Sequence, residues 1–381
     1  MRLQQLIYLD NSATTKPCKE AVAAAVNAME NSYGNPSSLY EFGMVAEDEV
    51  TTTRTVLAKA LFCRDDEIYF TSCGSESNNT AIFGATELLC RSGKHIVTTT
   101  IEHPSVLEPI KALEKNGYEV TRLSPDSNGI ISVADIENAI RKDTVLVSVM
   151  YVNNEVGSIL PVEKIKSICQ KNGSPALLHI DCVQAFGKIK INANALGADL
   201  MSFSAHKIHG IKGAGALFVK KGVRLPAFIK GGGQEKGLRS GTEGVPAIAA
   251  FGAAIKALPD LNKTAEEILR IKNHCIEKLK EFENVVINSP IDGSPYIINF
   301  SFLGYRSETI LHHLERFGIC VSSGSACSKG KGSYVLREMG LNSSLVDSAI
   351  RLSFSRETNL SDIDKLVDAL KSALSLRKSK Q

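Results

Sequence analysis

Short runs of apolar and β-branched residues alternate, over the first two thirds of the chain, with longer segments whose apolar residues recur every three to four positions. The short runs are typical of buried strands and the longer segments of amphipathic helices. Because strands that alternate with helices of this length form parallel βαβ units, we predict an α/β fold with a mainly parallel sheet flanked by helices. The predicted strands are 67–71, 95–99, 145–151, 176–181, 200–204 and 216–219, and the predicted helices are 45–61, 77–92, 105–116, 133–141 and 161–172.

The pattern changes after Leu258, where helices and strands mix without regular alternation. This mixture of helices and strands predicts a smaller α+β domain. We therefore divide the chain into a large domain, 16–258, and a small domain made of 1–15 and 259–381. In the small domain we predict helices at 264–282, 307–317 and 361–376, and strands at 285–288, 296–302 and 349–354.

Charge and cysteine content narrow the function classes. The chain has 44 Lys and Arg against 41 Asp and Glu, a formal net charge of +3, which argues against the strongly basic surface of a nucleic-acid-binding protein. No apolar run reaches the roughly 18–20 residues of a membrane helix, and the N-terminal segment does not resemble a secretory signal. Nine cysteines without a C-x-x-C pair fit a reducing compartment better than a zinc ribbon. We therefore expect a soluble, cytoplasmic protein that binds neither a membrane nor nucleic acid directly.

Polar clusters follow several predicted strands, at the edge where open α/β sheets bind their ligands. The segment 71–76 opens a helix, and its hydroxyl and backbone N–H groups suit a phosphate; a plain helix cap with a nearby Glu would show the same residues. His103 and Asn154 follow two other strands, and His103 taken alone could be structural. Asp181 ends a buried strand, where a carboxylate needs a cation or a protonated ring nitrogen as its partner.

Lys207 is the most reactive candidate among these strand-end residues. It follows His206 at the end of a strand and precedes the glycine-rich segment 210–219. A lysine among apolar residues and glycines loses solvation, which lowers its pKa and favours a neutral amine that can form a Schiff base. A zinc site built on His206 and His209 is the alternative, but further placed ligands are missing. A phosphate site, an Asp, a His and a Lys on successive strand ends are together what pyridoxal 5′-phosphate (PLP) requires.

These motifs resemble those of the cysteine desulfurases of the NifS and IscS type, which are fold-type I PLP enzymes of the class V aminotransferase family. The resemblance runs nearly from end to end. It implies that the large domain binds PLP. The motifs that carry it are YLDNSATT at 8–15, YGNPSS at 33–38, TSCGSES at 71–77, EHPSVL at 102–107, NNEVG at 153–157, DCVQAFGK at 181–188, SFSAHKIHG at 202–210, GGGQEKGLRSGT at 231–242 and SSGSACSKGKGS at 322–333.

The resemblance implies a role for each strand-end residue. Lys207 would bind the cofactor aldehyde covalently, and Asp181 would pair with the ring nitrogen and keep it protonated. His103 would stack on the ring and move protons, and Gln184 would contact the ring hydroxyl. Further cofactor contacts are implied for Asn154 and, around the phosphate, for Gly74, Ser75, Ser204 and His206.

The same resemblance implies contacts to a second subunit and to the substrate. Thr242 is similar to a residue that completes the phosphate site of the neighbouring subunit, so we expect a homodimer. Asn154 and Arg351 look like the pair that holds the substrate carboxylate, for which arginine offers a bidentate fork. A surface or interdomain ion pair is the alternative role of Arg351.

Cys327 is the expected nucleophile. It lies in the segment 322–332, whose small residues and glycines suit a flexible surface loop of the small domain. Lys329 and Lys331 would favour its thiolate. The resemblance implies that PLP-dependent removal of sulfur from L-cysteine gives L-alanine and a persulfide on Cys327. An iron–sulfur scaffold protein or a tRNA-thiolation enzyme would then accept the sulfur.

Alternatives stay open at this point. A selenocysteine lyase would differ only in its preference for selenium. The SSGSAC segment argues against an aminotransferase, and the presence of every proposed catalytic residue argues against a non-catalytic sulfur-relay protein. The chain departs from its relatives at Cys73-Gly74-Ser75, where Gly-Ala-Thr is common, and at Cys182, where alanine is common. We expect Cys182 and Cys320 to pack in the core.

Overall fold

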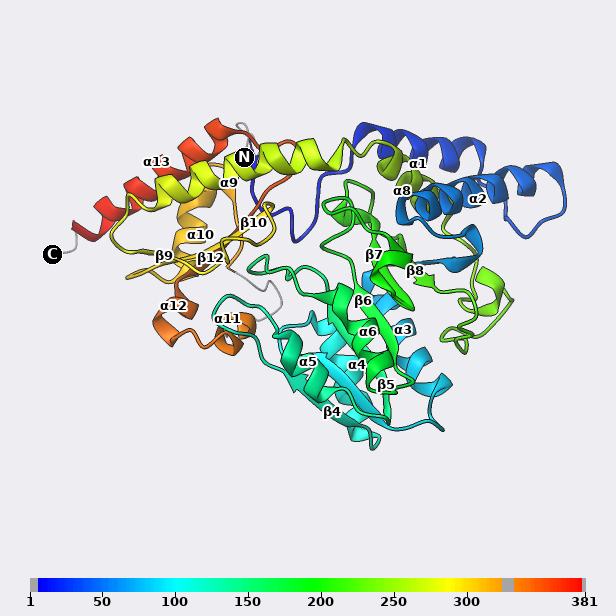
Figure 1. Ribbon diagram of the computed structural model, residues 1–381. Coiled ribbons are helices and arrows are strands. Elements are labelled where there is room, and N and C mark those ends of the chain that lie inside the picture. The colour runs from blue at the N-terminus through cyan, green and yellow to red at the C-terminus, as the bar shows by residue number, and fades with distance from the viewer. Residues whose placement is uncertain (1–5, 324–331, 379–381) are drawn as a thin grey trace.

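The computed structural model describes residues 6–323 and 332–378, and its largest element is a seven-stranded sheet (Figure 1). In chain order the strands of this sheet are β2 (Ile68–Thr71), β3 (His95–Thr99), β4 (Glu119–Leu123), β5 (Thr144–Met150), β6 (Leu177–Asp181), β7 (Leu200–Ser204) and β8 (Gly215–Val219). Their order across the sheet is β2-β8-β7-β6-β5-β3-β4. The pairs from β7 to β4 are parallel, and β8 is antiparallel to both β2 and β7. The carboxyl ends of β3, β5, β6 and β7 therefore meet at one edge.

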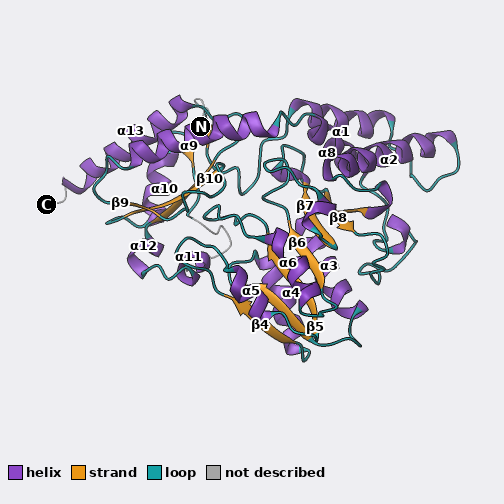
Figure 2. Ribbon diagram, viewed as in Figure 1, coloured by secondary structure: helices purple, strands orange, loops and turns teal. Residues whose placement is uncertain are grey.

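Helices cover both faces of this sheet (Figure 2). They are α3 (Gly74–Leu88), α4 (Pro104–Lys115), α5 (Val133–Ala139), α6 (Val162–Lys171) and the short α7 (Ala193–Leu196). Successive strand residues point to opposite faces, and adjacent residues of β3 fall into different apolar clusters. Ile96 shares a cluster with Ile82 of α3, whereas Val97 shares one with Ile165 of α6. Every residue of β3, β5, β6 and β7 is buried, as expected for parallel strands that helices cover on both faces.

A separate group of helices packs beside β2 and β8. α1 (Lys19–Asn31) and α2 (Glu41–Leu61) both contact α8 (Val245–Lys256), which is largely buried. The chain then passes Pro259 and enters α9 (Leu261–Leu279), whose N-terminus is capped because Asp260 Oδ1 accepts the Lys263 N–H at 2.9 Å. Three short 3₁₀ turns complete this part of the chain: η1 (Asp65–Glu67), η2 (Ala205–Lys207) and η3 (Glu235–Gly237).

The C-terminal part builds a second, smaller sheet. Its strands β9 (Val285–Ile287), β10 (Ile297–Phe302) and β12 (Ala349–Ser353) are antiparallel in the order β12-β10-β9. Near them β1 (Ile7–Tyr8) pairs in parallel with β11 (Ile319–Cys320), and the Ser12 N–H donates to Ser353 Oγ at 2.8 Å. The N-terminal segment thus lies with the C-terminal part, while the division into two domains stays a prediction. The remaining helices are α10 (Ser307–Glu315), α11 (Tyr334–Glu338), α12 (Ser343–Asp347) and α13 (Leu360–Lys378).

The predicted fold class, an α/β protein with a mainly parallel sheet, is confirmed. The pattern did not reveal α1, α8 or β4. α8 has apolar residues on all its faces because α1 and α2 cover it, so it shows little helical alternation, and β4 is a partly exposed edge strand with mixed residues. Within 6–323 and 332–378, the structure contains no helix that combines the length and apolarity needed to cross a membrane.

Candidate active site

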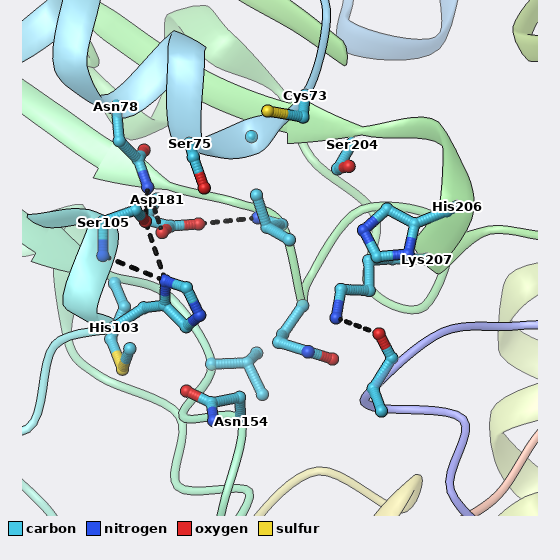
Figure 3. A pocket seen from close by; sticks show the side chains of 16 residues that line it. Cys73, Ser75, Asn78, His103, Ser105, Asn154, Asp181, Ser204, His206 and Lys207 are labelled. Atoms are coloured by element: carbon cyan, nitrogen blue, oxygen red, sulfur yellow. Dashed lines mark hydrogen bonds between the residues drawn. The ribbon is translucent and has the colours of Figure 1, made fainter. Parts of the chain in front are cut away.

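A cavity of about 250 Å³ opens at the edge where the parallel strands end (Figure 3). The structure brings together here nine of the residues that the sequence predicted: Gly74, Ser75, His103, Asn154, Asp181, Gln184, Ser204, His206 and Lys207. The remaining lining residues are Ala13, Cys73, Asn78, Ser105, Met150, Val152 and Val183. The lining residues come from the beginnings of α3 and α4, from the ends of β5, β6 and β7 and the residues that follow them, and from the N-terminal segment.

The first turn of α3 forms one wall of the cavity. Cys73 precedes the helix in an extended conformation and its side chain makes no capping bond, so the first N–H groups of α3 keep their capacity to bind an anion. A Cβ on Gly74 would lie 2.7 Å from Val183 Cγ2, so a larger residue here would require the Val183 side chain to shift. Beside Gly74, buried Ser204 Oγ has no hydrogen-bond partner among the residues that the structure describes. This wall fits a phosphate.

The alternative interpretation of this segment, a helix cap with a nearby Glu, is also partly present. Glu76 accepts the Ser72 N–H at 2.9 Å and pairs with Arg239 at 2.9 Å. Glu76 does not line the cavity. The cap and the anion site therefore coexist on different sides of the same turn.

Asp181 ends β6 and carries a buried carboxylate. Its Oδ1 accepts the Val183 N–H at 2.9 Å, and its Oδ2 accepts from Asn78 Nδ2 at 2.8 Å. Both donors are neutral, so the negatively charged carboxylate can still accept a hydrogen bond from a cationic N–H group in the cavity. Asn78 was not among the predicted site residues. It lies one helical turn after Gly74 and directly after the motif TSCGSES, and this spacing was the signal available.

His103 is the N-cap residue of α4. The Ser105 N–H donates to its Nδ1 at 3.2 Å, and Ser105 Oγ lies 2.8 Å from the same atom. Because a backbone N–H can only donate, Nδ1 is the unprotonated nitrogen and Nε2 carries the proton. Burial lowers the pKa of His103, Lys207 lowers it further, and Asp181 acts in the opposite direction. The ring is therefore neutral at neutral pH.

Lys207 ends the turn η2 and points its amine into the cavity. Nζ donates to the backbone oxygens of Ser12 and, at 2.8 Å, of Ala13. The Ser12 oxygen also accepts from Gln184 Nε2 at 2.9 Å. Next to the lysine, burial lowers the pKa of His206 to about 4, with further contributions from Lys207 and Lys212, so the His206 ring is also uncharged. The segment 8–15 thus supplies backbone oxygens that accept hydrogen bonds in the cavity. The side chains of this motif gave no sign of that role.

Two predicted residues of the described part of the chain, Arg351 and Thr242, do not line this cavity. Arg351 is buried in β12, where Nη1 donates to the Asn154 backbone oxygen at 2.9 Å and Nη2 pairs with Asp10 at 2.7 Å. The ion-pair alternative is thus present, although it joins two segments of the predicted small domain. Thr242 lies in a second cavity, of about 150 Å³. Cys327 lies outside the described residues.

Two other cysteines differ in their surroundings. Cys182 is buried directly after β6, and burial raises the pKa of its thiol well above the usual value, which agrees with a packing role. Cys320 was expected in the core, but in β11 it is partly exposed. The short strand β11 pairs with β1, and this pairing does not cover its side chain fully.

Residues 7–366 match the family model described as aminotransferase class-V. The chain belongs to the class V aminotransferase family. Among curated relatives, cysteine desulfurase IscS of Dictyoglomus turgidum is 39% identical, over 97% of this chain and 94% of the relative. Cysteine desulfurase IscS of Vibrio vulnificus is 41% identical, over 97% of this chain and 92% of the relative.

Solved structures agree with this family. A NifS-like protein has a TM-score of 0.92 at 34% identity and covers 98% of this chain and 100% of its own. A second structure, SspA in complex with cysteine, has a TM-score of 0.81 at 31% identity and covers 91% of this chain and 98% of its own. The fold is therefore that of the fold-type I PLP enzymes, as predicted.

This class V chain is PLP-dependent, and the cavity fits the cofactor. Asp181 has free acceptor capacity for a protonated ring nitrogen, and the α3 N-terminus with unpartnered Ser204 Oγ suits the phosphate. Lys207 offers an amine for the aldehyde, and the neutral imidazole of His103 offers a flat surface for the ring.

Replacement of the cavity lysine tests the covalent link. We predict that Lys207→Ala folds normally but reduces the amount of PLP fixed by borohydride to background, because no other described lysine amine lines the cavity. Peptide mass spectrometry after reduction measures this directly. Lys212→Ala, an exposed lysine in the same glycine-rich segment, is the matched control and should retain full fixation. Reduced PLP on a lysine other than Lys207 in the unmodified protein would refute the assignment.

Replacement of Asn78 tests the support of Asp181. We predict that Asn78→Ala weakens PLP binding by about ten- to hundredfold, because a hydrogen bond to a charged group contributes about 1.5–3 kcal/mol. Absorbance titration of the apoprotein with PLP measures the affinity. Asn79→Ala is the control, since Asn79 donates to the Ser75 backbone oxygen and does not contact Asp181. Equal affinities of the two variants would contradict the prediction.

Proposed function

We propose that the protein is a cysteine desulfurase that converts L-cysteine into L-alanine and leaves the sulfur as a persulfide on Cys327. The observation that supports this most is the meeting of Lys207, Asp181 and His103 in one cavity. This cavity belongs to a chain that is similar to desulfurases over nearly its whole length.

Each cavity residue has a part in the proposed reaction. Bound PLP supplies an electron sink that stabilises negative charge on the carbon next to the substrate amino group. Asp181 keeps the proton on the ring nitrogen, which strengthens that sink. Lys207 Nζ moves the α-proton of the substrate. His103 carries its proton on Nε2 and can deliver it to a group in the cavity.

Arg351 and Asn154 are the proposed ligands of the substrate carboxylate. Arg351 already donates to the backbone of Asn154, whose side chain lines the cavity, so the guanidinium lies directly behind the cavity wall. Its Nε and Asn154 Oδ1 have no hydrogen-bond partner among the described residues. The substrate carboxylate would exchange with Asp10, which occupies the guanidinium in this structure.

The thiolate of Cys327 attacks the sulfur of the substrate. The sulfur–sulfur bond of the persulfide forms as the carbon–sulfur bond breaks, and the bonding electrons stay with the carbon fragment, which takes up protons to become alanine. The described residues on both sides of the segment 324–331 support this role. Ser322 exchanges backbone hydrogen bonds with Arg351, at 3.2 and 2.7 Å, and the Tyr334 hydroxyl donates to the backbone oxygen of Glu102, next to His103.

We further propose that the persulfide passes its sulfur to a protein acceptor, either an iron–sulfur scaffold or a tRNA-thiolation enzyme. The outer sulfur of a persulfide is transferred by attack of a nucleophilic acceptor, such as the thiolate of a partner protein. Transfer of radiolabelled sulfur from L-cysteine to each purified acceptor distinguishes the two.

A homodimer is the proposed assembly. α1, α2 and the loop between them expose a group of apolar side chains, which is unusual for the surface of a monomer. A second copy that covers this face could also bring its Thr242 to the phosphate site, since Thr242 does not line the cavity of its own chain. The exposed apolar residues are Val22, Val26, Met29, Tyr33, Leu39, Tyr40, Phe42, Met44 and Val45.

Replacement of Cys327 separates cofactor binding from sulfur transfer. We predict that Cys327→Ser binds PLP, still changes its absorbance when L-cysteine is added, and releases alanine at least about a hundredfold more slowly, because a serine hydroxyl stays protonated at neutral pH. Cys320→Ser is the control and should keep normal turnover. Mass spectrometry of the unmodified protein after brief exposure to cysteine should find one added sulfur on the Cys327 peptide. Normal alanine release by Cys327→Ser would exclude the proposed mechanism.

Charges on the exposed apolar face test the dimer. We predict that the double variant Val26→Glu and Met29→Glu sediments as a monomer and binds PLP more weakly, because a buried unpaired carboxylate opposes association. Analytical ultracentrifugation measures the first effect and absorbance titration the second. Val133→Glu, at an equally exposed apolar position on α5, is the control. A monomeric unmodified protein with full PLP affinity would refute the dimer.

A further inference from the structure

Lys188 is a partly buried lysine close to the cavity that has no role in the proposed reaction so far. It follows a series of turns after β6, in which the Lys188 N–H donates to the Ala185 backbone oxygen at 3.1 Å. This turn brings Lys188 and Gln184, four positions apart, to the same side of the chain. Lys188 Nζ donates to Gln184 Oε1 at 3.0 Å.

This contact determines which way the amide of Gln184 faces. An ammonium group can only donate, so the atom of Gln184 that faces Lys188 must be the oxygen. On its other side, Gln184 Nε2 donates to the Ser12 backbone oxygen at 2.9 Å, and an oxygen there would meet another acceptor. Both contacts select one orientation, and they leave the second N–H of the buried, cavity-lining amide for an acceptor inside the cavity.

The surroundings of Lys188 make its charge unfavourable. No carboxylate pairs with it in the part of the chain that the structure describes, and Nζ lies 5.8 Å from the centroid of the Tyr296 ring. Burial, together with the positive charges of Lys207 and Arg351, lowers the pKa of Lys188 to about 7. Lys188 also lines a second, small cavity, and the titratable residues His209 and Arg356 line that cavity with it. An apolar residue would pack here at lower cost, so the amine needs a reason other than packing.

We propose that Lys188 is a positioning residue for the cofactor, because its amine holds Gln184 in the one orientation that directs an amide N–H toward the ring oxygen of PLP. The proposal rests on the proposed function and on the contact between Gln184 and the ring hydroxyl that the family resemblance implies. The chemistry recognised is an anionic aromatic oxygen, which a donor stabilises and an amide oxygen would repel.

A double-mutant cycle on the PLP-loaded protein tests this role. The absorbance of bound PLP changes with pH as the cofactor loses a proton, and a donor at the ring oxygen favours the deprotonated form. Lys188→Met and Gln184→Met should therefore each raise the pH midpoint of the spectral change by about one unit, and weaken PLP binding to the apoprotein by about three- to tenfold. In the Gln184→Met background, Lys188→Met should add almost nothing, because the residue through which it acts is absent.

Two further variants complete the experiment. Lys188→Arg keeps a donor at this position and should restore at least half of the shift. Lys190→Met removes an exposed lysine two positions later, whose amine lies over Phe62, and should leave the midpoint unchanged.

Each other outcome overturns a defined statement. An equal shift by Lys188→Met in both backgrounds would mean that the lysine acts by its charge alone and would refute positioning. A shift with Gln184→Met but none with Lys188→Met would also refute it, while the function stands. No shift with either variant would refute the contact between Gln184 and the ring oxygen. If the unmodified protein forms no alanine from L-cysteine, that result contradicts the proposed function and leaves the positioning role of Lys188 unaffected.

Discussion

The parallel pairing of β3, β5, β6 and β7 is the constraint on which the cavity depends. Parallel strands end at the same edge, so residues from distant parts of the chain arrive there without any contact in sequence. Every residue of these strands is buried by helices on both faces, which keeps the strands in this register. The buried carboxylate of Asp181 is tolerable at this edge because backbone and amide donors already point to it.

Much of the fold could be predicted because burial leaves a clear mark on the sequence. The predicted strands 95–99 and 200–204 match β3 and β7 in both bounds. The antiparallel direction of β8 could not be predicted, because apolar runs carry no information on direction. α8 was not predicted because apolar residues occur on all of its faces. Its sequence therefore lacks the alternation of apolar and polar residues that marks a partly exposed helix.

Some residues of the candidate site could be predicted from the sequence and others could not. Residues that lie at a strand end, such as Asp181 and Lys207, stand out in the sequence because polar groups rarely interrupt an apolar run without a function. Their partners do not stand out. Asn78 meets Asp181 across 103 positions, and Gln184 meets the Ser12 oxygen across 172 positions. Such pairs are created by the packing of the sheet, and a backbone acceptor such as the Ser12 oxygen has no side-chain signature at all.

Ser12 lies between the two sheets and is hydrogen-bonded to the smaller sheet and to residues beside the larger one. Its N–H donates to Ser353 in the smaller sheet, while its oxygen accepts from Lys207 and Gln184 beside the larger one. A single residue therefore spans the joint between them. Whenever the amine of Lys207 changes its bonding partner, the N-terminal segment loses or regains a tie to the larger sheet. The bonding state of one lysine therefore changes a contact that lies between the two sheets, while the Gln184 amide keeps the Ser12 oxygen bonded.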